Sequence, residues 1–189
     1  MTSQTTTPTA SHYSSAHVDP AAQVADAGFV PVQTRSERPH SFEPADFGVP
    51  TGREVNWKHT PVAKLTALFE TAAQNDGVAY EFSAGEQYLA APLAIGAAPR
   101  GEFFRGEDIT GAVAWQGATE AMHIRIPREE EVAEPILLTI EGRGAEKRAD
   151  AHIVIEALEH SSATVVLNHI GAAQYAQNVE IIARAGSRL

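Results

Sequence analysis

The chain of 189 residues contains no cysteine, and this absence excludes several kinds of chemistry. A disulfide framework, a cysteine-ligated zinc site, a thiolate-bound cluster and a cysteine nucleophile all require a thiol. None of these can be supplied by this chain.

Basic residues are also scarce, because 14 Lys and Arg face 24 Asp and Glu and leave a net charge of −10. A nucleic-acid-binding protein needs clustered basic side chains to neutralise phosphates. The same negative charge opposes docking on an anionic membrane surface. We therefore expect neither nucleic acid nor membrane among the partners.

Long apolar runs are missing as well, and no segment approaches the roughly 20 apolar residues of a membrane span. The first ten residues have neither the basic start nor the apolar stretch of a secretory signal peptide. These features predict a cytoplasmic protein.

The composition divides the chain into three parts. Residues 1–38 are polar and poorly patterned, which predicts a disordered tail, although the apolar residues 29–32 could dock on a partner. Residues 39–76 are predicted to form a helical N-terminal segment, and residues 77–189 a β-rich domain.

Capping signals and an apolar stripe support the helical segment. Thr51 and Glu54 have the spacing of a capping box. Thr60 and Pro61 form an N-cap followed by proline at the first helical position. The apolar side chains that follow lie on one helix face, and Gly77 should close the helix; the stripe consists of Val62, Leu65, Leu68 and Phe69.

After Gly77 the apolar period changes from helical to two. Short strands are predicted at residues 80–82, 112–115 and 122–126. Four later runs alternate cleanly and should each bury one face. They contain Ile136/Leu138/Ile140, Ile153/Ile155/Ala157, Ala163/Val165/Leu167 and Val179/Ile181/Ala183.

The spacing of these runs suggests a repeat. Leu138 and Val165 are 27 residues apart, and Ile155 and Ile181 are 26 residues apart. A two-sheet β-solenoid, in which each coil stacks on the one before, gives such an offset. An antiparallel β-sandwich gives similar strand spacing, so periodicity alone leaves both folds open.

No group of residues makes a convincing catalytic, cofactor or metal site. His152, His160 and His169 invite a zinc interpretation, but strand parity and a turn position keep them from converging, so turn and surface positions are expected. The three carboxylates at 129–131 do not face one another and indicate a solvated turn. We expect no catalytic, cofactor-binding or metal-binding residue.

Other chemical motifs are equally weak. Glu156 and Glu159 flank the end of a strand, with the same poor geometry as the acidic run. The glycine-rich stretches 142–144 and 96–99 lack the Lys-Ser/Thr of a phosphate-binding loop and indicate turns. The β-rich part has only one Trp, so it offers few aromatic platforms for a sugar chain.

Three passages of the chain resemble one family. Residues 50–54 with 57–61, residues 124–127 with 132–136, and residues 163–167 with 178–180 are similar, in this order, to signatures of SufD. SufD is a scaffold subunit of the SUF iron–sulfur cluster assembly machinery and a member of the SufB/SufD family. The resemblance extends over residues 40–189.

This resemblance implies a helical segment followed by the first coils of a right-handed parallel β-helix. It further implies a non-catalytic scaffold that pairs with a SufB-like subunit and a SufC-like ATPase. The iron–sulfur cluster then belongs to the assembled complex, and this chain binds no cofactor directly. Because the family is longer, we expect the chain to end inside the β-helix, with the main partner contacts beyond residue 189.

Two other classes of function remain as alternatives. A carbohydrate-active β-helix or β-sandwich enzyme would need a groove with clustered carboxylates. An interaction module would use the apolar residues 29–32 of the tail to bind a partner.

Overall fold

A computed structural model describes residues 39–189, and the predicted tail with its apolar residues 29–32 lies outside this part. The described part is mainly β, as predicted. Its elements are the 3₁₀ turns η3 (Pro44–Asp46), η4 (Val55–Trp57), η5 (Val62–Lys64), η6 (Thr66–Phe69) and η7 (Glu86–Tyr88), strands β1 (Val78–Ser83), β2 (Leu89–Ala94), β3 (Glu120–Ile126), β4 (Ile136–Ala157) and β5 (Val165–Ala183), and helix α2 (Ile109–Gly117). No helix in residues 39–189 is long and apolar enough to cross a membrane.

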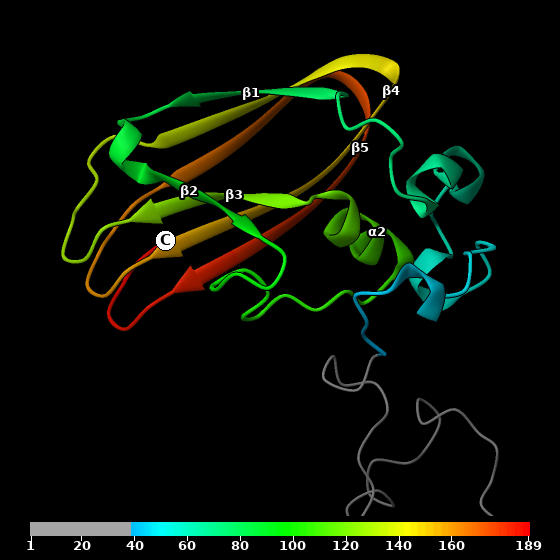
Figure 1. Cartoon of the computed structure of the whole chain (residues 1–189), viewed down its shortest axis with the longest axis horizontal. Helices are drawn as coiled ribbons and strands as arrows, with labels where there is room; N and C mark the ends of the chain where they lie inside the picture. Colours follow the sequence, from blue (N-terminus) through cyan, green and yellow to red (C-terminus); the bar gives the residue numbers. More distant parts are fainter. Residues whose placement is uncertain (1–38) are drawn as a thin grey trace, which may run out of the picture. The chain divides into compact units, whose positions relative to one another are not determined.

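The strands form one mixed sheet in the order β1-β4-β3-β2, with β5 also paired to β4 (Figure 1). The β1–β4 and β2–β3 pairs are antiparallel. The β3–β4 and β4–β5 pairs are parallel. The four alternating runs pair in parallel through β4 and β5, which is not the pairing of an antiparallel sandwich.

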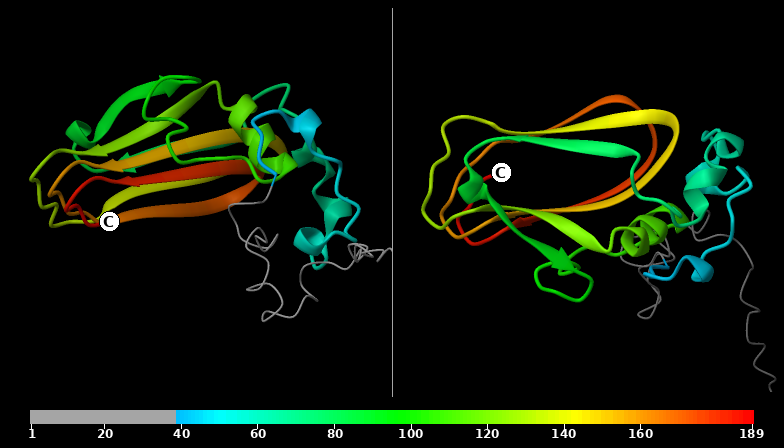
Figure 2. Two further views of the ribbon diagram at one scale, coloured as in Figure 1. Left: turned by 90° about the horizontal axis from the view of Figure 1, so that it is seen from below. Right: turned by 45° about the horizontal axis from the view of Figure 1, so that its top comes forward.

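Strands β4 and β5 follow the same bent path, so that their first and second halves form opposite walls (Figure 2). The predicted runs are thus joined in pairs within two long strands. Ile155 pairs with Ile181 at the predicted offset of 26 residues. Leu138 pairs with Leu167 rather than Val165, an offset of 29, because the ladder shifts register at the bend.

The bend brings two glycines close together. Gly142 pairs with Gly171, whose φ is +72°, and a Cβ on either residue would collide with the other strand's backbone. Only glycine tolerates the positive φ at position 171 and the close approach of the two backbones. The two glycines therefore allow β4 and β5 to turn together.

The main core fills the space between the two walls. Burying each of these aliphatic side chains contributes about 1.5–3 kcal/mol, so this row is the principal source of stability. Its members come from the inner face of β3 and from both halves of β4: Ile124, Ile126, Ile136, Leu138, Ile140, Ile153 and Ile155.

The turns at one end of the walls are stacked in three levels. Glu129, His160 and Gly186 occupy successive turns, and each has a positive φ, of 61°, 61° and 71°. Parallel bridges join the same turns, from Glu131 to Ser162 and from Ser162 to Arg188. The chain therefore repeats one turn geometry three times.

The helix predicted from Thr60 to Gly77 is wrong, because this stretch contains only the short 3₁₀ turns η5 and η6. Pro61 has a ψ of 68°, and Leu65 a ψ of 3°, so helical geometry does not propagate. Three of the four residues of the apolar stripe still pack together. Val62 and Leu65 join a second core around Phe69, with Ile109 and Val113 of α2.

One half of the capping box between Thr51 and Glu54 is formed, and it closes a turn and not a helix. The carboxylate of Glu54 accepts the backbone N–H of Thr51 at 3.0 Å and its hydroxyl at 2.8 Å. The next element is the three-residue turn η4.

The strand predicted at 112–115 is also wrong, since these residues lie in α2. Asp108 caps this helix by accepting the N–H of Gly111 at 2.8 Å. The apolar run is buried on more than one side, which hides a helical period. The strands at 80–82 and 122–126 are confirmed as β1 and β3, while β2 was not predicted.

Candidate functional site

Helix α2 and the 99–106 loop cover the second half of β4 and β5 on the outer face, opposite the core (Figure 1). Four residues form a buried polar group there, which we call the outer-face cluster: Arg100, Trp115, His152 and Glu180. The side chains of His152 and Glu180 are 0% and 1% exposed. Buried polar groups of this kind are either structural or functional, so their partners decide between the two.

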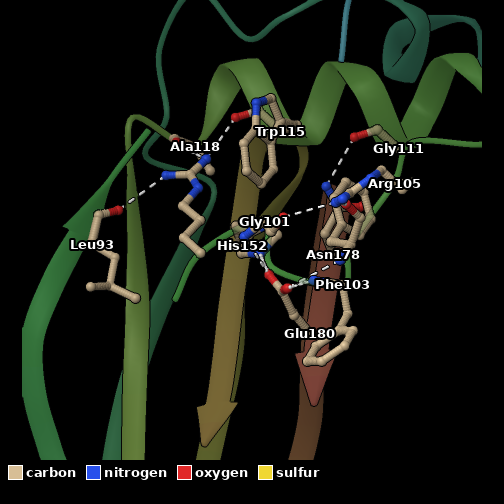
Figure 3. A network of polar contacts seen from close by, with 12 residues as sticks. Leu93, Gly101, Phe103, Arg105, Gly111, Trp115, Ala118, His152, Asn178 and Glu180 are labelled. Carbon is tan, nitrogen blue, oxygen red and sulfur yellow. Dashed lines mark hydrogen bonds and ion pairs between the residues drawn. The ribbon is translucent and has the colours of Figure 1, made fainter. Parts of the chain in front are cut away.

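Glu180 fastens the loop to the sheet (Figure 3). Its carboxylate accepts backbone N–H groups from Gly101 at 2.7 Å, Phe103 at 2.7 Å and Phe104 at 3.0 Å. His152 Nε2 lies 3.3 Å from the same carboxylate. Both oxygens of Glu180 are therefore engaged by the protein itself.

Arg100 holds the end of α2 in a similar way. Its guanidinium donates to the carbonyls of Trp115 at 2.8 Å and Ala118 at 2.7 Å, near the negative end of the helix dipole. It also donates to Leu93 of β2 and Thr119, at 3.2 and 3.3 Å. The guanidinium carbon lies 4.5 Å from the centre of the Trp115 ring, a cation–π contact.

The neighbouring strand pair repeats the His–Glu arrangement. His152 is opposite Asn178 in the ladder and reaches Glu180, two residues further along β5. His123 of β3 is opposite Val154 and reaches Glu156, two residues further along β4, at 3.2 Å.

The second pair connects to a surface ion pair. Arg184 donates to Glu156 at 2.7 Å and to Glu102 of the loop at 2.6 Å. The loop is therefore attached to the sheet through both glutamates of the outer face.

Burial sets the protonation of these groups. Burial and the nearby Arg100 lower the pKa of His152 to about 4, so its imidazole is neutral at pH 7. Burial also lowers the pKa of His123. Burial alone would raise the pKa of Glu180, but the backbone N–H groups of the loop outweigh it and lower the value. The outer-face cluster thus contains the carboxylate of Glu180, the guanidinium of Arg100 and the neutral imidazole of His152.

The three histidines of the zinc interpretation lie in different surroundings. His160 lies in an exposed turn, and His169 is an exposed residue of β5 that contacts Gln177 at 2.8 Å. No group of three or more His, Asp and Glu side chains suited to a metal occurs within residues 39–189. His152 differs from the expectation of a surface position, because α2 and the loop cover it.

The acidic and glycine-rich motifs behave as turns and bends. Residues 129–131 lie at the stacked turn, where Glu130 accepts the hydroxyl of Tyr88. Glu156 is buried in its pair with His123, whereas Glu159 pairs with Arg128 at 3.0 Å near the surface. Residues 142–144 lie at the bend of β4, and 96–99 in a turn after β2.

Sequence reasoning missed Arg100 and Glu180 as partners of His152. The available signal was parity: His152, Val154 and Glu156 alternate with Ile153 and Ile155, so they must share the opposite face. The pattern did not indicate that α2 and the 99–106 loop cover this face.

Comparison with known proteins gives relatives over most of the chain. The chain is 30% identical over 150 residues, or 79% of its length, to the iron–sulfur cluster assembly SufBD family proteins of Mycobacterium tuberculosis and Mycobacterium bovis. The corresponding protein of Mycobacterium leprae is 29% identical over 154 residues. The chain is a homologue of SufBD family proteins. The relatives carry the SufBD family name, which confirms the resemblance to the SufB/SufD family.

The match has a defined extent. The chain spans 38% of the length of each of these relatives. No protein-family model matches the chain. No solved structure matches it either.

Proposed function

We propose that this chain is a non-catalytic, SufD-like scaffold subunit in iron–sulfur cluster assembly. The observation that carries the proposal is the 30% identity to SufBD family proteins over 79% of the chain. The SufD-like assignment within that family rests on the three passages that resemble SufD, at residues 50–61, 124–136 and 163–180.

The corresponding fold is the beginning of a right-handed parallel β-helix. Two features support it: the parallel stacking of β3, β4 and β5, and the three stacked turns that contain Glu129, His160 and Gly186. In a solenoid each repeat contacts its neighbours and presents a similar edge to the next. Strand β5 presents such an edge, with Ile181 at 60% exposure.

A scaffold role without catalysis fits the chemistry of the outer face. Glu180, Arg100 and Glu156 each bind other parts of the chain, and these contacts hold the loop and α2 in place. These 189 residues offer no thiolate, so in this proposal the cluster is cargo of the complex and is not ligated by this part of the protein. The alternative of a carbohydrate-active enzyme gains no support from a particular observation.

The partners that go with this role are a SufB-like subunit and a SufC-like ATPase, in a complex of SufB–SufC–SufD type. A cytoplasmic location accompanies the proposal. Protein surfaces, and not nucleic acid or membrane, are the binding targets, in keeping with the net charge of −10.

Co-purification tests this proposal. The gene product that contains this chain is tagged and co-expressed with the SufB and SufC homologues of the same genome, and the tag alone serves as the control. We expect both homologues to elute with the tagged protein and not with the tag. Elution of the tagged, folded protein without either homologue would overturn the proposal.

A further inference from the structure

A cavity of about 460 Å³ opens between strands β1, β2, β3 and β4, beside Asn75. This volume falls within the roughly 300–1,000 Å³ of small-molecule sites in proteins. The residues that the scaffold proposal uses on the β5 edge do not line it.

The cavity exists because the inner row of β4 becomes small toward this end. Ile155 and Ile153 fill the core, but the next inward positions are Ala151 and Ala149. Met122 of β3 pairs with Ile153 and is only partly buried against the core. A leucine at position 151 would occupy part of the space that alanine leaves open.

The wall of the cavity is mostly apolar, with a few polar groups. Tyr80 brings its ring and a hydroxyl that lies 3.4 Å from the hydroxyl of Tyr175. Leu89 is 43% exposed at the rim. Aromatic rings and the Met122 thioether pack well against other aromatic rings. Such a wall suits a ligand with a flat, apolar body.

The charges around the cavity disfavour an anion. Its lining includes Glu120 and no lysine or arginine. Asp150 also lines it, but its carboxylate is paired with Arg148 at 2.6 Å and accepts the backbone N–H of Ala72. His123 and His152 lie in the lining too, and both are turned to glutamates on the outer face. An anionic ligand would therefore meet the negative charge of Glu120 and no lysine or arginine in the lining.

We propose that this cavity binds a small aromatic molecule that is neutral or cationic. The inference rests on the cavity and its lining alone and is independent of the scaffold role.

Two fluorescent probes that share one ring system test the proposal. N-phenyl-1-naphthylamine is neutral, and 8-anilino-1-naphthalenesulfonate adds a sulfonate to the same framework. Titrated into the purified 189-residue chain, the neutral probe should saturate with one site and bind at least about tenfold more tightly than the anion, since tenfold corresponds to about 1.4 kcal/mol. Equal affinities, or no saturable binding of the neutral probe, would overturn the proposal.

Matched variants place the site. Ala151→Leu should weaken binding of the neutral probe about tenfold or more, whereas Ala145→Leu, at an exposed position outside the cavity, should not. Leu89→Asp at the rim provides a second variant if Ala151→Leu does not fold, and it should weaken binding as well. Ile181→Lys removes apolar surface at the β5 edge and should leave binding unchanged. Binding that is lost in Ile181→Lys and kept in the cavity variants would contradict the assignment.

Discussion

The Nε2 atom of His152 on β4 lies 3.3 Å from the carboxylate of Glu180 on the adjacent strand β5, and both side chains are completely enclosed. Around this pair, one carboxylate satisfies three backbone N–H groups of the 99–106 loop. The pair therefore couples the sheet to the loop that covers it.

Replacing the charge at this point tests the coupling. Glu180→Gln keeps the shape of the side chain but weakens hydrogen bonds that each contribute about 1.5–3 kcal/mol when the acceptor is charged. We expect the free energy of unfolding to fall by about 2–4 kcal/mol in urea denaturation. Glu146→Gln, at an exposed position near the bend of β4, is the matched control and should change stability little. Equal effects of the two substitutions would show that the cluster does not hold the loop.

Acid should destabilise the fold through His152. The pKa of His152 falls from its ordinary value of 6.5 to about 4 in the folded state, so between these values the unfolded chain binds the proton more readily. The stability due to the neutral imidazole is complete above pH 6.5 and is lost as the pH falls toward 4, by about 3 kcal/mol. Unfolding free energies measured between pH 7 and 4 should show this loss.

The variant His152→Asn removes the titrating group and should flatten part of that profile. A loss of stability between pH 6.5 and 4 that is as steep in the variant as in the natural chain would assign the effect to other groups.

The stacked turns make a prediction about Gly186. Its φ of +71° lies in the left-handed region, and a Cβ at this position would collide with the imidazole of His160. Gly186→Ala should therefore lower the free energy of unfolding by about 1–2 kcal/mol. Gly48→Ala is the control, because a Cβ there meets no atom within 4 Å. Thermal melts that shift equally for both variants would argue against a strained turn.

The edge of β5 should make the 189-residue chain self-associate. A strand of 19 residues without a further partner in the described structure presents backbone donors and acceptors, next to the exposed Ile181. Sedimentation velocity should show species larger than the monomer. Ile181→Lys should shift the distribution toward monomer, while Val55→Lys, also at an exposed position, should not. A monodisperse monomer at high concentration would contradict this account of the edge.

The strand predictions succeeded where alternation reported one buried face. Ile153 and Ile155 share one face of β4 and lie in the core, and the 26-residue offset to Ile181 is an actual pairing. The run Val179/Ile181/Ala183 was also predicted to bury its face, and this was wrong: the three residues are exposed, and the alternate residues Asn178, Glu180 and Ile182 are buried instead. The 27-residue offset from Leu138 failed, because apolar alternation cannot locate the register shift between Arg143 and Arg148. The predicted partner of Leu138, Val165, and its actual partner, Leu167, are two residues apart and lie on the same strand face, so the apolar pattern cannot distinguish them.

The helix predictions failed for local reasons. The stripe from Val62 to Phe69 is real, but a stripe records burial and not backbone hydrogen bonding, and short 3₁₀ turns bury it equally well. The run 112–115 was too short and too apolar to separate strand from helix, although the Asp108 cap marked the helix start.

The outer-face cluster was beyond the reach of the sequence for a different reason. Parity places His152 and Glu156 on one face, but the partners of that face come from the 99–106 loop, whose path depends on tertiary contacts of Arg100. No periodic pattern describes such a loop.

Native mass spectrometry of the three co-expressed proteins tests the central claim most directly. The gene product that contains this chain, expressed with the SufB and SufC homologues of the same genome, should appear in an assembly that contains all three. A spectrum in which SufB and SufC assemble while this protein remains alone, in a folded state, would contradict the scaffold account.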